Sequence, residues 1–578
     1  MSVPRRFWLA IATVSLLAVA LRLFGLQYGL PAVYNPDEVA IMARALSFAR
    51  GTLNPHNFLY PTFYFYVLFA WVGTYLGWVW LTGRVASIDA VQQLYFTDPT
   101  GIYTAGRLLG VATGAATIAV VARLALRLTD TRTAIAAAIF LSVAPLHVRD
   151  SHYVKHDVPA TLAIVLAYLA ISRVWPCARD EGARASDTLL AGAACGVAFS
   201  IHYYCIFLAI PLTLAVALGW RRQGATACLR QLTLAGIASL VVFFALSPFL
   251  LVEPVTAWRD ITANRQIVID RAVATGAFAP ATRYLELLRV DAMGQPVAFL
   301  AVLGIVWMAA AAPARAILLL AFPLPFLLFI ANTAPASRYL NPVLPFLAIF
   351  AGWGLSRLAH TLAGGRTVVY WTAVVLAAAP ALQASIASDR FIRQDDTRTL
   401  AERFIASSLP AGATILTQPY SAVLTPSREG LIEALAQNLG SAQAASMKFQ
   451  LQLGLNPYPS PAYRLIYLGR GGLDADKIYV DPSALGGAAG LEPLRRLGVQ
   501  YVLIKRYNKP DPETLPLLTM LSREGRRIAA FSPYRPGVSE AERARIDPFL
   551  HNTDARIDDA LERPGPPLEI WQLNAPGT

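Results

Sequence analysis

Two short polar segments of the sequence carry closely spaced residues that could perform acid–base and anion chemistry. Asp37 and Glu38 are adjacent carboxylates shortly after the first apolar block. Lys155 and Asp157 belong to a second polar segment, residues 149–159, between two later apolar blocks. A carboxylate can take the proton of an attacking hydroxyl group, and a nearby cation can stabilise a departing phosphate. These residue types therefore suit the transfer of a group from a phosphate to a hydroxyl.

Further polar residues stand near the ends of apolar blocks, namely Arg107, His202, Arg338 and Tyr339. Each feature also has a plain structural interpretation. The segment that begins at Pro36 can simply start a helix, residues 149–159 can be a solvated loop, and an arginine near the membrane surface can extend its charged end to water. Taken together, the residues indicate one outward-facing site that contains both acids and cations.

The composition of the chain indicates what kind of structure must position these residues. The 578 residues are 56% hydrophobic and 15% charged, with a mean hydropathy of +0.47. Many apolar blocks have the length of a bilayer span. This excludes a disordered chain, a coiled coil and a simple soluble enzyme. The net charge of +13 does not indicate nucleic-acid binding, because many arginines flank apolar blocks, where they orient helices.

Arginine clusters between the apolar blocks predict the orientation, because positively charged loops stay on the cytoplasmic side. Arg5 and Arg6 precede the first block, so the N-terminus is predicted to be cytoplasmic. An odd number of spans places the C-terminal region outside the plasma (inner) membrane. We predict about eleven spans, at residues 7–27, 103–128, 132–148, 158–175, 188–201, 204–220, 231–252, 296–312, 315–331, 339–359 and 367–386.

One further apolar block, residues 58–82, is long enough to cross the membrane but is rich in tyrosine, tryptophan and phenylalanine. These residues are typical of the membrane–water interface. A crossing here would also move every later arginine cluster to the outer side. The sequence therefore favours a juxtamembrane or re-entrant segment on the outer side, with a true span as the alternative.

The chain divides into two predicted domains, residues 1–386 in the membrane and residues 387–578 outside it. The second part has ordinary polar composition, a helical pattern at 396–408 and no nucleotide-binding loop. Short apolar runs between proline and glycine signals predict strands at 414–417, 464–467, 501–504 and 568–573. The predicted fold is mainly α, a polytopic helical bundle followed by an extracytoplasmic α/β domain.

A reaction that uses a sugar donor linked to a lipid phosphate would need the acids, the cations and a site at the membrane surface. The donor's prenyl chain stays in the bilayer, so the site must lie at the membrane surface, and no soluble nucleotide is needed. At the polar motifs the sequence resembles the GT-C glycosyltransferases, and most closely the group of protein O-mannosyltransferases and lipid A aminoarabinose transferases. The motifs are NPDE at 35–38, YP at 60–61 with AGRLLG from 105, SHYVKHDVP from 151 and RYLNP at 338–342.

The resemblance implies an inverting transfer from a polyprenyl-phosphate sugar, with no other cofactor required. It implies Asp37 as the general base and Asp157 as support for the donor or acceptor sugar, and Glu38 is the other carboxylate candidate. By the same resemblance the lipid phosphate would contact Arg107, Arg338 and Tyr339, and Lys155 and His202 are further candidates.

The sequence also departs from this group. Where aminoarabinose transferases have an acid–base pair before the proline of the aromatic block, this chain has Leu59 and Tyr60 before Pro61, so we predict no metal site there. The predicted partners are the bilayer, the lipid-linked sugar and an acceptor that is a protein, a lipid or a polysaccharide. A transporter or flippase of lipid-linked sugars, or a non-catalytic subunit that binds them, are the alternatives.

Overall fold

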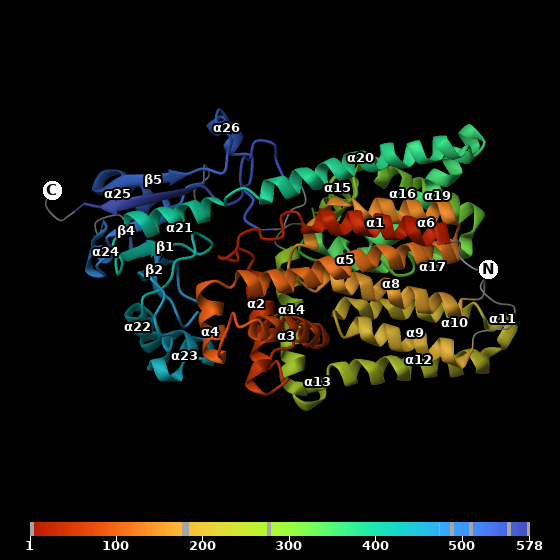
Figure 1. Cartoon of the computed structure of the whole chain (residues 1–578), viewed down its shortest axis with the longest axis horizontal. Helices are drawn as coiled ribbons and strands as arrows, with labels where there is room; N and C mark the ends of the chain where they lie inside the picture. The colour runs from red at the N-terminus through yellow and green to blue at the C-terminus, as the bar shows by residue number, and fades with distance from the viewer. Residues whose placement is uncertain are drawn as a thin grey trace.

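The computed structural model describes residues 5–175, 184–273, 279–472, 474–485, 490–507, 512–551 and 557–574, and the predicted fold class is confirmed. Most of the chain is helical. In Figure 1 a bundle of long helices fills one end of the molecule and a small sheet with its helices fills the other end. The first helix starts at the end of the bundle that is far from the sheet.

The bundle contains helices that are long and apolar enough to cross a membrane, so the chain is a multi-span membrane protein. Their apolar side chains reach the outer surface of the bundle, as for Leu16 and Val241, which are 70% and 62% exposed. The long helices are α1 (Arg5–Leu23), α5 (Thr100–Leu128), α8 (Asp157–Val174), α12 (Ala225–Leu246), α19 (Leu344–Ala363) and α20 (Thr367–Ile392). Shorter helices complete the bundle: α6 (Thr131–Ser142), α9 (Ala185–Phe199), α10 (Ala209–Ala217), α16 (Gln295–Ala311), α17 (Pro313–Leu320) and α18 (Pro323–Ile330).

The predicted count of about eleven spans is not confirmed. In the described residues eight helical segments have the length and hydropathy of a span. The number is nine if the bent pair of helical segments Ala279–Ala292 and Gln295–Ala311 counts as one span. Predicted spans at 132–148, 188–201 and 204–220 correspond to apolar helices of 10–17 residues. The aromatic block forms α3 (Phe63–Leu81), which is long and apolar enough to cross a membrane. Its placement outside the bilayer stays a prediction.

Arginines near the ends of predicted spans hold neighbouring connections together at one end of the bundle. Arg132, at the start of α6, donates hydrogen bonds to the Gly365 carbonyl oxygen at 2.9 Å and to the Thr367 hydroxyl at 2.8 Å. Arg127 donates to the Ser172 carbonyl oxygen at 3.1 Å. Three of the predicted cytoplasmic connections therefore meet at this end, which agrees with one common side for them.

Further helices lie between the bundle and the sheet, as Figure 1 shows for α2, α4 and α14. Most of them belong to loops that the sequence predicts to be external, but residues 145–148 and 249–252 fall at the ends of the predicted spans 132–148 and 231–252. These helices are α2 (Pro36–Leu46), α4 (Ile88–Thr97), α7 (Pro145–Asp150), α13 (Phe249–Val252), α14 (Pro254–Val273) and α15 (Ala279–Leu287). This layer carries most of the polar motifs.

The C-terminal region forms a six-stranded sheet in the order β3-β2-β1-β4-β6-β5. The first four are parallel neighbours and β6 runs antiparallel to both β4 and β5. Leu416 and Ile466 pack into one apolar core, and Ile415 and Leu465 pack into a second core. Because neighbouring strand residues point to opposite faces, both faces of the sheet are covered. The strands are β1 (Thr414–Thr417), β2 (Arg464–Leu468), β3 (Ile478–Val480), β4 (Tyr501–Lys505), β5 (Gly525–Phe531) and β6 (Leu568–Leu573).

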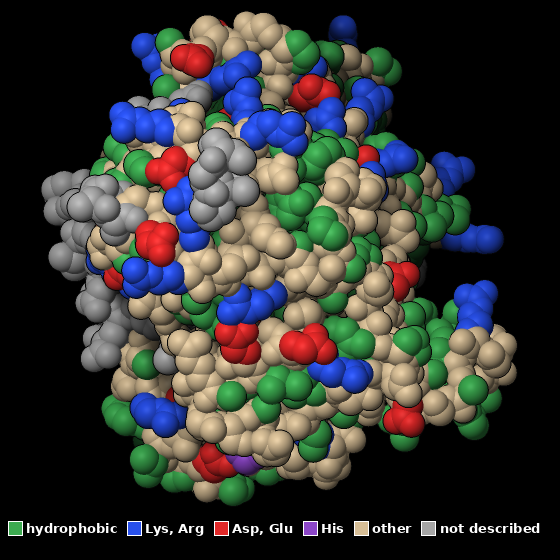
Figure 2. All heavy atoms as spheres, turned by 90° about the vertical axis from the view of Figure 1, so that its left-hand side faces the viewer, with side chains coloured by type: hydrophobic (Ala, Val, Ile, Leu, Met, Phe, Trp, Pro, Cys, Tyr) green, Lys and Arg blue, Asp and Glu red, His purple; other side chains and the backbone are tan. Residues whose placement is uncertain are grey.

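The four strands predicted from the sequence are confirmed, and β3 and β5 were not predicted. The helices of this region are α21 (Thr397–Ser408), α22 (Arg428–Leu439), α23 (Met447–Leu453), α24 (Glu492–Arg496), α25 (Leu515–Glu524) and α26 (Glu540–Arg543). The predicted domain boundary at residue 386 falls inside α20, which continues to Ile392. Figure 2 views the molecule from the sheet end, where basic and acidic side chains are scattered over the whole face. Such a surface suits contact with water.

Candidate active site

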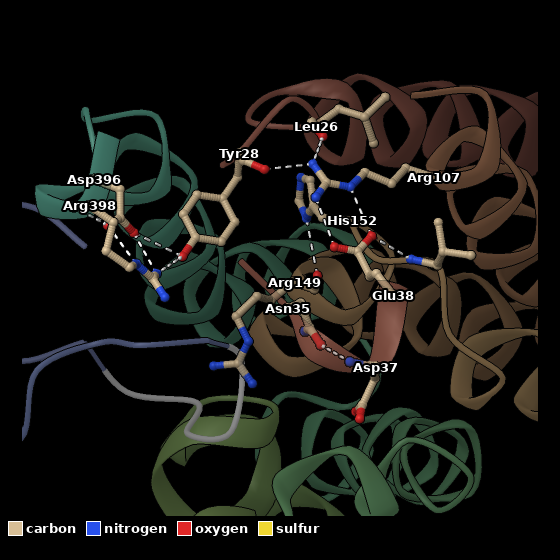
Figure 3. A network of polar contacts seen from close by, with 11 residues as sticks. Leu26, Tyr28, Asn35, Asp37, Glu38, Arg107, Arg149, His152, Asp396 and Arg398 are labelled. Atoms are coloured by element: carbon tan, nitrogen blue, oxygen red, sulfur yellow. Dashed lines mark hydrogen bonds and ion pairs between the residues drawn. The ribbon is translucent and has the colours of Figure 1, made fainter. Parts of the chain in front are cut away.

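The start of α2 places the two neighbouring carboxylates of the first polar segment. Asn35 caps the helix, because its side-chain oxygen accepts a hydrogen bond from the Asp37 amide at 3.1 Å, and Pro36 occupies the first turn. Successive helix residues differ by about 100° around the axis. Asp37 and Glu38 therefore point in different directions, as Figure 3 shows. The Asp37 side chain is 42% exposed, whereas that of Glu38 is 0% exposed.

Glu38 forms a fully buried, two-point ion pair with Arg107 of α5. The Arg107 guanidinium donates to the two Glu38 carboxylate oxygens at 2.9 and 2.8 Å. Its third nitrogen donates to the carbonyl oxygens of Leu26 and Tyr28, both at 2.7 Å. The Val154 amide also donates to Glu38 at 2.9 Å. This pair joins the segment after α1 to α2, α5 and the second polar segment (Figure 3).

Asp37 faces two cations that come from distant parts of the chain. Its Oδ2 lies 2.9 Å from Lys155 Nζ and 3.5 Å from a guanidinium nitrogen of Arg338. Burial by itself would raise the pKa of Asp37, but Lys155 and Arg338 outweigh burial and hold the pKa below its ordinary value. Asp37 is therefore ionised at neutral pH. It is also open to solvent, so the cluster can receive a ligand.

Arg338 lies in a short 3₁₀ turn, Ser337–Leu340, between α18 and α19. Burial by itself would lower the pKa of its guanidinium. The nearby Tyr339, Asp157 and Asp37 outweigh that effect, so the pKa of Arg338 is raised. Its guanidinium carbon also lies 5.2 Å from the centre of the Tyr339 ring. The structure thus brings residues of three predicted motifs together around one permanent cation.

Lys155 reaches Asp37 because the second polar segment lies close against α5. A Cβ atom on Gly110 would lie 2.7 Å from the Ser151 carbonyl oxygen, so a side chain there would push the segment away. Lys155 is 4% exposed and its Nζ lies 5.8 Å from the centre of the Tyr153 ring. Asp157 begins α8 directly after this segment. Close backbone packing therefore sets the positions of both Lys155 and Asp157.

His202 lies in an aromatic cluster next to Arg338. Its ring stacks on Tyr204 with the ring centres 3.7 Å apart, and its centre is 5.2 Å from that of Tyr60. Tyr60 in turn stacks on His156 at 4.3 Å. Burial and, to a lesser extent, the charge of Arg338 lower the pKa of His202 to about 3. His202 is therefore neutral, and it adds no positive charge to the cluster.

The C-terminal domain supports the loop that leads into α2. Arg398 forms a two-point ion pair with Asp396, at 2.8 and 2.7 Å, and its guanidinium carbon lies 3.8 Å from the centre of the Tyr34 ring. The Tyr34 hydroxyl lies 2.7 Å from the Thr399 hydroxyl. Arg398 also contacts the Tyr28 hydroxyl at 3.3 Å (Figure 3). The two domains therefore meet directly beside Asp37.

His551 is a residue of this cluster that the sequence analysis missed. Burial lowers its pKa, Lys155 lowers it further, and Asp37 has the opposite effect, so His551 lies near both Lys155 and Asp37. The neighbouring Leu550 carbonyl oxygen accepts a hydrogen bond from Arg398 at 2.7 Å, which fixes this part of the chain. The position lies far along a polar region without a recognisable motif, so no signal in the sequence marks it.

The structure separates the predicted site residues into two groups. Asp37, Lys155, Asp157, Arg338, Tyr339 and His202 come together. Glu38 and Arg107 lie behind this group and are 0% and 1% exposed, because they pair with each other. Within the described ranges, no three histidine, cysteine, aspartate or glutamate side chains are arranged to hold a metal ion. The expected lack of a metal stays a prediction.

A family model and solved structures resemble this chain. The model for dolichyl-phosphate-mannose-protein mannosyltransferases matches residues 102–251. No curated protein matches the sequence. The apo oligosaccharyltransferase of Archaeoglobus fulgidus has a similar structure, with a TM-score of 0.52 at 10% identity over 98% of this chain and 88% of that chain.

Two further solved structures resemble it less. ArnT from Cupriavidus metallidurans, bound to undecaprenyl phosphate, has a TM-score of 0.48 at 14% identity over 90% of this chain and 95% of that chain. The Pmt1–Pmt2 complex of S. cerevisiae, bound to the sugar donor, has a TM-score of 0.34 at 19% identity over 44% of this chain and 35% of that chain. The predicted resemblance is confirmed, and the chain has a GT-C glycosyltransferase fold.

Proposed function

We propose that this chain with a GT-C fold is an inverting membrane glycosyltransferase that uses a polyprenyl-phosphate sugar as donor. The observation that carries the proposal is Asp37, an exposed and ionised carboxylate that is held between two cations at the outer layer of the bundle. The donor class is also supported by the matched family, whose description names dolichyl-phosphate mannose. Transfer would occur on the outer face of the plasma (inner) membrane.

In the proposed reaction, the acceptor hydroxyl attacks the anomeric carbon of the donor. The new carbon–oxygen bond forms while the bond between that carbon and the phosphate oxygen breaks. Asp37 takes the hydroxyl proton, and the lipid phosphate leaves with the electron pair. Lys155 and Arg338 stabilise the charge that grows on the phosphate. Asp157, Tyr339 and His202 contact the sugar or the phosphate from the same side.

Binding of the donor would also change Asp37. In the free protein Lys155 and Arg338 neutralise its charge, and this makes Asp37 a weak base. A phosphate that takes over these two cations places a negative charge near Asp37, which raises the pKa of the carboxylate. Asp37 thus becomes a stronger base only when the donor is present.

The test of this function is the release of polyprenyl phosphate by the purified full-length protein. A panel of polyprenyl-phosphate sugars is offered with membrane extract as the acceptor. We expect release from one donor, and its loss in Asp37→Asn. A folded protein that binds the lipids without releasing the phosphate would contradict the proposal, and would favour a transporter or a non-catalytic binding subunit.

Arg338→Gln is expected to weaken the binding of undecaprenyl phosphate about 10- to 100-fold, because one charge-assisted hydrogen bond to the phosphate is lost. The measurement is a titration of the purified variant with the lipid, followed by native mass spectrometry. Arg403→Gln, at an exposed ion pair with Asp395, is the matched control and keeps normal affinity. Equal affinity of Arg338→Gln and the wild type would rule out this role of Arg338.

The pH dependence of kcat/KM tests the pairing of Asp37 with Lys155. Because the pKa of Asp37 is lowered in the free protein, the acid limb of the profile is expected below the pKa of an ordinary aspartate. Lys155→Gln removes the main group that lowers this pKa, while burial still raises it. The acid limb therefore moves to higher pH.

The shape of the profile is the readout, since Lys155→Gln also slows the reaction at every pH. Lys477→Gln, which removes a cation that pairs with Asp474 in the C-terminal domain, keeps the wild-type profile. An acid limb that stays in place in Lys155→Gln would show that Asp37 is not the group that titrates.

A further inference from the structure

A cleft of about 490 Å³ lies between the C-terminal domain and the external layer, outside the cluster around Asp37. Residues 31–34 and 95–97 line it from the membrane domain, and residues 423–426, 448–449 and 452 line it from the C-terminal domain. Cavities at the interface between domains are frequent sites for small molecules and polymer segments. The residues in its walls indicate what the cleft can hold.

Aromatic side chains line both sides of the cleft. Tyr95 and Phe96 of α4 lie on the membrane-domain side, and Phe449 of α23 and Tyr467 of β2 lie on the sheet side. The rings of Tyr95, Phe96 and Phe449 are half-buried, so their faces remain partly open. Aromatic rings provide large rigid contact areas with a little polarity, which suits the C–H faces of sugar rings.

Two carboxylates stand among these rings without a partner of their own. In the described part of the chain Glu402 of α21 and Asp476 make no hydrogen bond and no ion pair, although both are half-buried and line the cleft. An ionised carboxylate accepts several hydrogen bonds, and hydroxyl groups are suitable donors. Among the described residues that line the cleft, Lys448 is the one cation. This balance of charge disfavours a phosphate or another anion and favours a neutral ligand with many hydroxyl groups.

The cleft shares a wall with the helix that carries Asp37. Val39 of α2 lines the cleft, and it is about 200° around the helix axis from Asp37. Tyr34, in the loop before α2, also lines the cleft and contacts Arg398 and Thr399 of the C-terminal domain. A ligand that reached both places would be an extended chain that passes around this loop.

We infer that the cleft binds a saccharide segment of the acceptor, so that the acceptor of the proposed transfer is a glycan chain. The role of this saccharide as the acceptor rests on the proposed function. The binding of a saccharide to the cleft does not depend on it. The aromatic rings hold sugar faces, and Glu402 and Asp476 accept hydrogen bonds from the sugar hydroxyls. The cleft thereby keeps a growing chain close to Asp37 between transfers.

Two variants of the full-length protein test the inference, with membrane extract as the source of acceptor. Phe449→Ala removes a ring from the cleft, and Glu402→Gln keeps the size of the side chain but removes its charge. Each is expected to raise the extract concentration for half-maximal transfer at least about fivefold, with an unchanged KM for the donor. Glu492→Gln, at an exposed ion pair with Arg496, is the control.

Treatment of the extract identifies the class of acceptor. Oxidation with periodate, quenched before the donor is added, should abolish its acceptor capacity, whereas digestion with proteinase K should leave it intact. If proteinase K abolished the acceptor capacity of the extract and periodate left it intact, the inference would be overturned in favour of a peptide acceptor. Normal KM values for the extract in both cleft variants would overturn it as well.

A binding experiment separates this inference from the proposed function. Immobilised Asp37→Asn protein is incubated with the glycan fraction of the extract, and retained sugar is measured after acid hydrolysis. We expect retention that Phe449→Ala and Glu402→Gln abolish in the same background. If sugar were retained but the wild type released no polyprenyl phosphate, the proposed transferase function would be refuted and saccharide binding by the cleft would be supported. Absence of retention, together with normal release, would refute the cleft alone.

Discussion

Asp37→Asn should lower the rate of sugar transfer about 10²- to 10⁴-fold, which is the range for loss of a general base. The amide has nearly the same shape but takes no proton from the attacking hydroxyl. The same change removes a negative charge that lies 2.9 Å from Lys155 and 3.5 Å from Arg338. Undecaprenyl phosphate is therefore expected to bind at least as tightly as it binds to the wild type. The opposite signs of the two effects make the prediction specific.

The comparison needs both transfer rates and lipid titrations of one purified preparation. Asp395→Asn is the matched control, because Asp395 is half exposed and pairs with Arg403 away from the cluster. It should keep both the rate and the affinity. A full transfer rate in Asp37→Asn would remove this residue from the mechanism. A low rate with weak lipid binding would mean that Asp37 only maintains the structure of the cluster.

Arg107→Met is expected to lower the free energy of unfolding by about 3–5 kcal/mol, because it leaves Glu38 as an unpaired charge in the interior. The change also removes the donors to the Leu26 and Tyr28 carbonyl oxygens. The apparent melting temperature of the protein in detergent should therefore fall strongly. The loop before α2 would lose its attachment, so transfer should fall as well, even though Arg107 is too deeply buried to contact the donor.

A double variant distinguishes this explanation from a simple loss of packing. In Arg107→Met with Glu38→Gln neither member of this buried pair is charged, and part of the lost stability should return. Arg403→Met, at an exposed ion pair, should change stability by about 1 kcal/mol or less. If Arg107→Met melted at the wild-type temperature, the buried pair would not stabilise the fold, and the predicted contact of Arg107 with the lipid phosphate would regain support.

The sequence predicted much of the cluster because its members share a visible property. Asp37, Lys155, Asp157 and Arg338 are polar residues at the outer ends of apolar blocks, and a bilayer brings such ends to one level. The resemblance to GT-C enzymes selected the same positions. The helical bundle and four strands were predictable for the same reason, since long apolar blocks and short apolar runs between turn signals are local patterns.

The remaining features depend on direction and on distant contacts, which no local pattern contains. Asp37 and Glu38 look equivalent in the sequence, and only the rotation of α2 sends one to the surface and the other to Arg107. Arg107 was assigned to the phosphate from the resemblance alone. The sequence does not reveal that Arg107 is buried, because burial results from the packing of the bundle. His551 could not be found, because it reaches the cluster only through the contact between the domains.

The contact between Tyr34 and Thr399 joins residues that are 365 positions apart in the chain. During synthesis, the segment that carries Asp37 is inserted long before α21 emerges from the ribosome. It lacks the stacking of Arg398 on Tyr34 until the C-terminal domain has folded. The order of biosynthesis thus makes this early segment depend on a late part of the chain for its final form. A nascent or interrupted chain would carry the segment with Asp37 without the support of these contacts.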